Sequence, residues 1–144
     1  MATQAQLVLT SDVSGDPTNV DTGLITLTKA GGTNELDQTT GLNRVHLRST
    51  TQKVLLAANA EGDNLAAKVY IINKSDDASL YLTVSINAQS IGKLYGGDFM
   101  FIPWSQTDTA ASIKVAATNW TSSTGDIPVE YALFHEDTDF LTNA

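Results

Sequence analysis

The sequence contains no cysteine. Disulfide frameworks, thiol nucleophiles and cysteine-ligated zinc sites are therefore excluded. Charge is also scarce: 17% of the 144 residues are charged, and 8 Lys and Arg against 16 Asp and Glu give a formal net charge of −8. Proteins that bind the phosphate backbone of nucleic acids or anionic lipid need a basic surface. The charge balance therefore argues against a nucleic-acid partner and against a membrane-surface partner.

Long apolar runs and targeting signals are missing as well. No stretch approaches the roughly 18 apolar residues of a transmembrane helix, and residues 1–6 do not place a basic segment before an apolar one. We therefore expect neither a membrane span nor a Sec-type export signal. With 42% apolar residues, the chain has enough material for one core of ordinary size. No repeat, low-complexity run or linker divides it, so residues 1–144 are predicted to form a single domain.

Threonine and serine are abundant, with 30 of 144 residues, and the β-branch of threonine fits a pleated strand better than a helix. Residues 80–86 alternate apolar and polar side chains, which is the period of a half-buried strand. No segment keeps the 3.6-residue period of a helix over a dozen residues. Further strands are predicted at residues 4–11, 24–29, 43–49, 53–57, 69–73, 91–95, 98–103, 112–118 and 129–133. The sequence therefore predicts an all-β fold of about nine or ten short strands, an antiparallel β-sandwich or jelly-roll-like domain, with a small barrel as the alternative.

Candidate catalytic and metal-binding residues are sparse. His46 and His135 fall in unrelated predicted strands, and no Gly-x-Ser-x-Gly motif offers a serine nucleophile. The carboxylates of residues 12–21, 76–77 and 136–139 lie in turns and do not match a calcium-binding loop. We therefore expect solvated turn residues, no cofactor, no metal ion and no enzymatic activity.

The aromatic residues are confined to residues 70–144, since none of the ten precedes Tyr70. Both faces of the predicted strand at residues 98–104 are apolar, which indicates burial between two layers or between subunits. Residues 1–21 carry one short apolar run and then a Gly-Asp-Pro break, which is compatible with an extended N-terminal arm. Core packing is the commoner role for such side chains, and the candidates for an interface are Leu7, Leu9, Phe99, Phe101, Trp104 and Trp120.

Five segments of the second half follow one another in a characteristic order: VYIIN (69–73), LYLTV (80–84), IGKLYGGDFMFIPW (91–104), IKVAA (113–117) and VEYALF (129–134). This order resembles that of small virion structural proteins of tailed bacteriophages, most closely capsid decoration (cement) proteins. The resemblance covers residues 69–134, under half of the chain. It implies a non-enzymatic β-sandwich on the outer capsid surface of a virion assembled in the host cytoplasm. Its partners would be the major capsid protein and further copies of itself, as a dimer or trimer.

Two other classes of function remain open on the same residues. A receptor- or glycan-binding module of a phage fibre, neck or tail would use Tyr95, Trp104 or Trp120 as stacking platforms. An enzyme, such as a polysaccharide-cleaving spike domain, would need two carboxylates facing each other across a groove. Exposure of a tryptophan beside polar groups would favour the receptor- or glycan-binding module over a decoration protein.

Overall fold

The computed structural model describes residues 3–12, 15, 18–27, 36, 38–57, 66–105 and 111–135. These residues form thirteen strands, and every pairing between strands is antiparallel. The predicted all-β sandwich is confirmed, but the number of strands is higher than the nine or ten predicted. Within the described ranges, no helix has the length and apolar character needed to cross a membrane.

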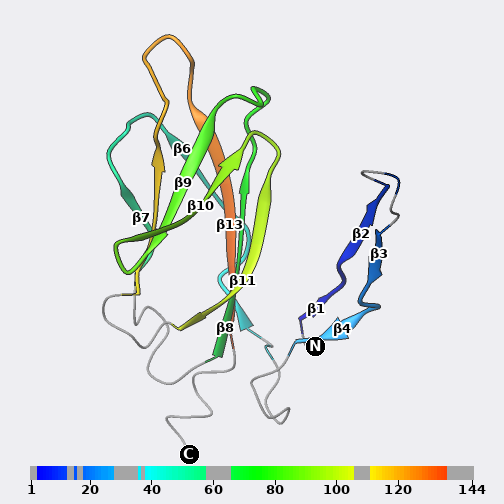
Figure 1. The fold of residues 1–144 in the computed structure, drawn as a ribbon. Helices are drawn as coiled ribbons and strands as arrows, with labels where there is room; N and C mark the ends of the chain where they lie inside the picture. Colours follow the sequence, from blue (N-terminus) through cyan, green and yellow to red (C-terminus); the bar gives the residue numbers. More distant parts are fainter. Residues whose placement is uncertain are drawn as a thin grey trace, which may run out of the picture.

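Nine strands build the sandwich (Figure 1). One sheet has the order β10-β9-β12-β7, and the other has the order β11-β8-β13 with β5 and β6 both paired to β13. The bounds are β5 (Gln38–Thr39), β6 (Asn43–Leu47), β7 (Lys53–Leu56), β8 (Ala66–Asn73), β9 (Tyr81–Ile86), β10 (Gln89–Tyr95), β11 (Phe99–Ser105), β12 (Ile113–Ala117) and β13 (Ile127–His135). The two-residue strand β5 was not predicted, because its sequence has no apolar alternation.

The strands pair in nested order along the chain. β9 pairs with β10, β8 with β11, β7 with β12 and β6 with β13. The additional pairs β13·β8 and β12·β9 join these hairpins into two four-stranded arrays. This nested arrangement is the topology of a jelly roll. The innermost pair, β9 and β10, is joined by a tight turn at Asn87 and Ala88. Both residues have positive φ angles, as a two-residue hairpin turn requires.

The core lies between the two sheets and consists of alternate residues from each strand. The fully buried side chains include Val69 and Ile71 of β8, Leu82 and Val84 of β9, Ile113 and Val115 of β12, and Val129 and Leu133 of β13. Because the side-chain period of a strand is two, the intervening residues of these strands point outward from the sandwich.

A buried asparagine at the end of β8 links this strand to the β8–β9 loop and to β10 at one end of the core. Asn73 closes β8 and is 0% exposed. Its Nδ2 donates hydrogen bonds to the carbonyl oxygens of Leu80, at 3.1 Å, and Leu94, at 2.9 Å, and its Oδ1 accepts one from the Ser75 amide at 2.9 Å. The amide therefore satisfies backbone groups of the β8–β9 loop and of β10 that would otherwise be buried without partners.

The N-terminal residues form a two-stranded ribbon of four short strands, β1 (Gln4–Ala5), β2 (Val8–Ser11), β3 (Thr18–Asp21) and β4 (Ile25–Thr26). These strands pair only with each other, β1 with β4 and β2 with β3. In Figure 1 the ribbon stands beside the sandwich. The predicted strand at residues 4–11 is thus interrupted, the predicted strand at 24–29 starts at Ile25, and β3 was missed because Thr18–Asp21 is mostly polar.

Candidate interaction surface

A bulge divides the ribbon into a base and a tip. Leu7 and Thr22 pair across the ribbon, with the Thr22 amide donating to the Leu7 carbonyl oxygen at 3.0 Å. The next pair is Ala5 with Ile25, so the single residue Gln6 opposes two residues of the other strand. The first of these two, Gly23, has a φ of 66°, in the left-handed region that favours glycine. Such a bulge bends and twists the ribbon at this point.

Asp21 holds the bulge in place. Its Oδ1 accepts hydrogen bonds from Gln6 Nε2 at 2.9 Å and from the Gly23 amide at 2.8 Å. The hydrogen bond from the Gln6 side chain, followed by that from the Gly23 amide, lowers the pKa of Asp21 below its ordinary value. Asp21 is therefore ionised at neutral pH.

One face of the ribbon is apolar. Leu9 is paired with Val20, and Leu7 precedes Leu9 by two residues, so these three side chains share a face. They are exposed to 42% (Leu7), 51% (Leu9) and 39% (Val20). Val8 lies on the opposite face together with its cross-strand partner Asp21. The ribbon strands form a single two-stranded layer, so no second layer of the ribbon packs on this apolar face.

The outer face of the β11–β8–β13 sheet is also apolar beside the ribbon. Phe101 of β11 lies opposite Tyr70 of β8, and Phe99 lies opposite Ile72. Phe99 is 58% exposed, and the Phe101 ring lies 6.5 Å from that of Phe134 on β13. These outward side chains form an aromatic row, defined here as Tyr70, Phe99 and Phe101.

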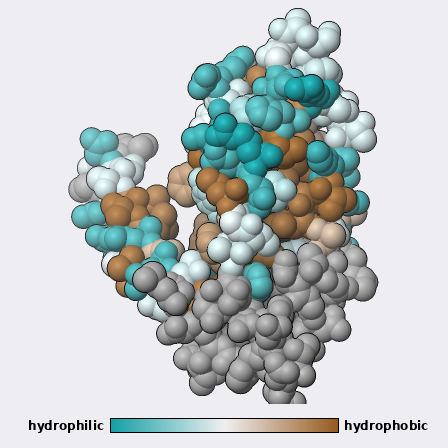
Figure 2. Space-filling model, turned by 180° about the vertical axis from the view of Figure 1, so that it is seen from behind, coloured by the Kyte–Doolittle hydropathy of each residue, from teal (hydrophilic) through white to brown (hydrophobic). Residues whose placement is uncertain are grey.

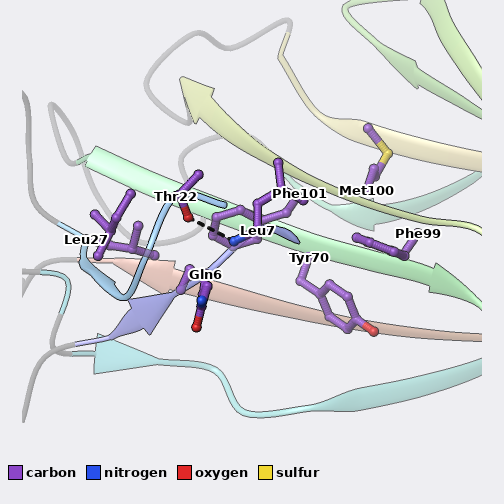
Figure 3. Close-up of a pocket in the computed structure, with 10 residues that line it drawn as sticks. Gln6, Leu7, Thr22, Leu27, Tyr70, Phe99, Met100 and Phe101 are labelled. Atoms are coloured by element: carbon purple, nitrogen blue, oxygen red, sulfur yellow. Dashed lines mark hydrogen bonds between the residues drawn. The ribbon is translucent and has the colours of Figure 1, made fainter. Parts of the chain in front are cut away.

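The ribbon base and the aromatic row enclose an apolar cleft of about 410 Å³ (Figure 3). Its lining comes from both sides: Ala5, Gln6, Leu7, Thr22, Ile25 and Leu27 from the ribbon segment, and Tyr70, Phe99, Met100 and Phe101 from the sandwich. None of these side chains is charged. Figure 2 shows apolar surface on the ribbon and, across a gap, on the body of the molecule. The cleft is suited to an apolar polypeptide surface rather than to a charged ligand.

Charged groups lie on the same sheet face, outside the cleft. Glu130 of β13 forms an ion pair with Arg44 of the neighbouring strand β6. The hydrogen bond from Arg44, with the further positive charge of Lys74, lowers the pKa of Glu130. Burial, and secondarily the negative charge of Glu130, raises the pKa of Tyr70. Lys68 precedes Tyr70 by two residues and so points to the same side.

The predicted interface residues separate into two groups. Leu7, Phe99 and Phe101 line the cleft, and Leu9 lies one residue pair further along the same ribbon face. Trp104 instead belongs to the core, because it is 5% exposed and its Nε1 donates a 2.7 Å hydrogen bond to the Ala111 carbonyl oxygen. Trp120 packs against the core and does not line the cleft. Neither indole therefore provides the exposed stacking platform expected of a glycan-binding module.

Replacing Trp104 with phenylalanine is expected to lower the free energy of unfolding by about 1–3 kcal/mol, since the buried Ala111 carbonyl oxygen loses its partner. Urea unfolding followed by circular dichroism measures the change. Trp120→Phe is the matched control, because the Trp120 Nε1 makes no hydrogen bond and its loss should cost less. Equal costs for the two variants would contradict the role given to the Trp104 hydrogen bond.

The sequence analysis did not identify Tyr70, which lines the cleft on the sandwich side. The signal was available, because Val69, Ile71 and Asn73 alternate with Lys68, Tyr70 and Ile72, and only one of these sets can face the core. Ile25 and Leu27 were assigned to a strand, but the strand itself does not indicate that its apolar side chains face β11.

The other residues considered for chemistry do not converge. His46 lies opposite Pro128 near the start of β13, whereas His135 ends β13 at the far side of the sheet. Asp76, Asp77 and Asp126 line a shallow groove with Lys74, but within the described ranges no group of three or more potential ligands could hold a metal ion. Asp16 and residues 136–139 lie outside the described residues.

An aromatic pair lies on the outer face of the other sheet. The rings of Tyr81 and Tyr95 are 5.1 Å apart and tilted by 47°, and Lys93 Nζ lies 4.7 Å from the centroid of the Tyr81 ring. Tyr95 is 41% exposed. The hydroxyls of Thr83 and Thr118 share a 2.6 Å hydrogen bond nearby on the same sheet. This flat surface combines aromatic and hydroxyl groups, unlike the cleft.

Comparisons with protein-family models, with curated proteins and with solved structures find no match to this chain.

Proposed function

We propose that this chain is a non-enzymatic decoration (cement) protein that binds the outer lattice of a phage capsid and stabilises the shell. The observation that carries the proposal is the uncovered apolar face of the ribbon beside a jelly-roll domain. Jelly rolls recur in viral capsid and lectin domains. The order of strands at residues 69–134, which resembles decoration proteins, gives the proposal its specific form.

The mechanism is thermodynamic linkage. A protein that binds the assembled lattice but not the separated capsid subunits shifts the equilibrium toward the assembled shell. The ribbon is suited to bridging, because its strands make no ladder with the sandwich and its tip carries Leu9 and Val20 at the surface. The net charge of −8 repels the packaged DNA and keeps many displayed copies soluble.

The test is the binding of purified protein to empty shells of the phage that encodes it, measured by co-sedimentation. Deleting residues 1–12 removes β1 and β2 and leaves every strand pair of the sandwich intact. We expect the deletion to weaken lattice binding at least about tenfold, a loss of 1.4 kcal/mol or more, while the melting temperature changes little.

Tyr95→Ala is the matched control, because Tyr95 lies on the other sheet and should not affect lattice binding. Unfolding of the truncated protein would show that the ribbon is part of the core and would refute its role as an arm. If the intact protein does not bind empty shells but binds glycans, the cement proposal is refuted.

The second candidate function is a receptor- or glycan-binding module, which the Tyr81–Tyr95 pair favours through its exposed ring and neighbouring hydroxyls. Under this alternative, Tyr95→Ala would abolish binding on a glycan array, whereas the deletion of residues 1–12 would leave it unchanged. The two functions thus predict opposite responses to the same pair of variants.

A further inference from the structure

The cleft opens at the edge of β11 as well as on the outer face of its sheet. Phe99 and Phe101 point outward, whereas Met100 lies between them in the strand and packs against the core. All three residues line the cleft, so the cleft reaches around the edge of the strand. β11 ends the strand order of its sheet, and among the described residues this edge pairs with no further strand. Native proteins often cover such an edge with another segment of the chain.

The described contacts hold the ribbon at its base. The Thr3 amide donates to the Leu36 carbonyl oxygen at 2.8 Å, and the Leu36 amide donates to the Leu27 carbonyl oxygen at 3.0 Å. Leu36 is 0% exposed, so the base is fixed at a buried residue. Beyond the bulge, no described strand pairing joins the ribbon tip, residues 7–11 and 18–22, to the sandwich. The bulge is therefore placed as a hinge between a fixed base and the tip.

The apolar face of the tip continues along the cleft toward Phe99. In Figure 3, Leu27 lies toward one end of the cleft and Phe99 toward the other, with Leu7 between them. Leu9 follows Leu7 on the same ribbon face, in the direction away from the base, so it extends toward the Phe99 end. Bending at the hinge would bring Leu9 against Phe99 and cover side chains that are 51% and 58% exposed.

The connection within one chain favours the ribbon tip over any other occupant of the cleft. A segment that is joined to the same molecule by a short linker acts at an effective concentration of about millimolar. A second copy or a foreign peptide must compete from its free concentration, which is far lower in a dilute solution. The tip is therefore the occupant that reaches the cleft most readily.

We propose that the ribbon tip is a flap that closes over the free edge of β11 in the isolated protein, with Leu7, Leu9 and Val20 packed against the aromatic row. Closure is a property of the isolated chain and goes beyond the proposed capsid function. It also regulates access to the ribbon, because a partner that binds the apolar face must first displace the flap and so binds with a lower apparent affinity.

The absence of cysteine makes closure directly testable by cross-linking. The double variant Leu9→Cys and Phe99→Cys places one thiol on the tip and one on β11 of the same chain. A short bismaleimide that spans the about 10 Å between two packed layers is added at low protein concentration. The products are separated by size, and we expect an adduct within one chain.

The control pairs Phe99→Cys with Val8→Cys, because Val8 is exposed to 56%, close to the 51% of Leu9, but lies on the opposite face of the ribbon. The adduct within one chain should form at least about tenfold faster for the Leu9 pair, since thiols that are held together react at a higher effective concentration. Equal rates for the two pairs, or adducts that mainly join different chains, would overturn the proposal.

A second measurement uses anilinonaphthalene sulfonate, a dye whose fluorescence reports exposed apolar surface. Leu9→Gln weakens the closed state, so the dye fluorescence should rise above that of the native chain, whereas Val8→Gln should leave it unchanged. A native chain that binds the dye as strongly as Leu9→Gln, or an equal rise in both variants, would contradict closure. Neither measurement uses capsid shells, so a failure of closure is distinguishable from a failure of lattice binding.

Discussion

Replacing Asn73 with aspartate is expected to lower the free energy of unfolding by at least about 3 kcal/mol at pH 7. The substitution keeps the shape of the side chain but removes the Nδ2 donor, so the carbonyl oxygens of Leu80 and Leu94 lose their partner. It also buries a carboxylate at a position that is 0% exposed, facing two carbonyl oxygens. Urea unfolding at several pH values measures the effect.

The pH dependence of the stability of Asn73→Asp shows whether the buried carboxylate charge causes the loss of stability. Burial raises the pKa of the introduced carboxyl above its unfolded value, so the folded state binds the proton more tightly. Stability should therefore fall as pH rises from the unfolded pKa through the folded pKa, and should partly recover in acid. Asn119→Asp is the matched control, because the exposed Asn119 makes similar hydrogen bonds, to the Ser79 carbonyl and from the Tyr81 amide. Equal costs at positions 73 and 119 would contradict the importance of burial.

Replacing Gly96 with alanine is expected to cost about 3 kcal/mol, or roughly 10 °C in melting temperature for a domain of this size. A Cβ at this position would lie 2.4 Å from the Asp77 carbonyl oxygen and 2.7 Å from that of Ser75. Both obstacles are backbone atoms of the β8–β9 loop, so no side-chain rotation relieves the overlap. Thermal unfolding followed by circular dichroism measures the shift.

The neighbouring Gly97 separates steric overlap from backbone strain. Gly97 has a φ of 94° but no atom within 4 Å of its Cβ position. Gly97→Ala should therefore cost only the strain of a left-handed alanine, about 1–2 kcal/mol. A Gly96→Ala protein that is no less stable than Gly97→Ala would show that the loop at Ser75 and Asp77 moves aside.

Strand positions were largely predictable because alternation is a local property. Residues 80–86 predicted β9, and the two-glycine turn at 96–97 was expected between β10 and β11. The strands that were missed, β3 and β5, are short and polar, and cross-strand pairing rather than alternation forms them. The break in the first predicted strand depends on the bulge opposite Gln6, which involves residues on the other side of the ribbon.

The orientation of β11 could not be read from its own residues. Phe99, Phe101 and Trp104 were all candidates for an interface, since both faces of the strand are apolar. The register against β8 decides the matter, because Trp104 lies opposite Ala67 and Phe101 lies opposite Tyr70. Ala67 faces the core and Tyr70 faces outward, so Trp104 is buried and Phe101 lines the cleft.

The sequence by itself determined the all-β class, most strand positions, the absence of disulfides and the acidic charge, because these follow from composition and from side-chain alternation over a few residues. Only the tertiary structure decided the nested pairing, in which β6 meets β13 more than 80 residues later, and the cleft between ribbon and aromatic row. Pairing register and sheet packing are set by contacts between residues distant in the chain. A local pattern predicts a strand, but it does not select the strand's partner or the face that stays exposed.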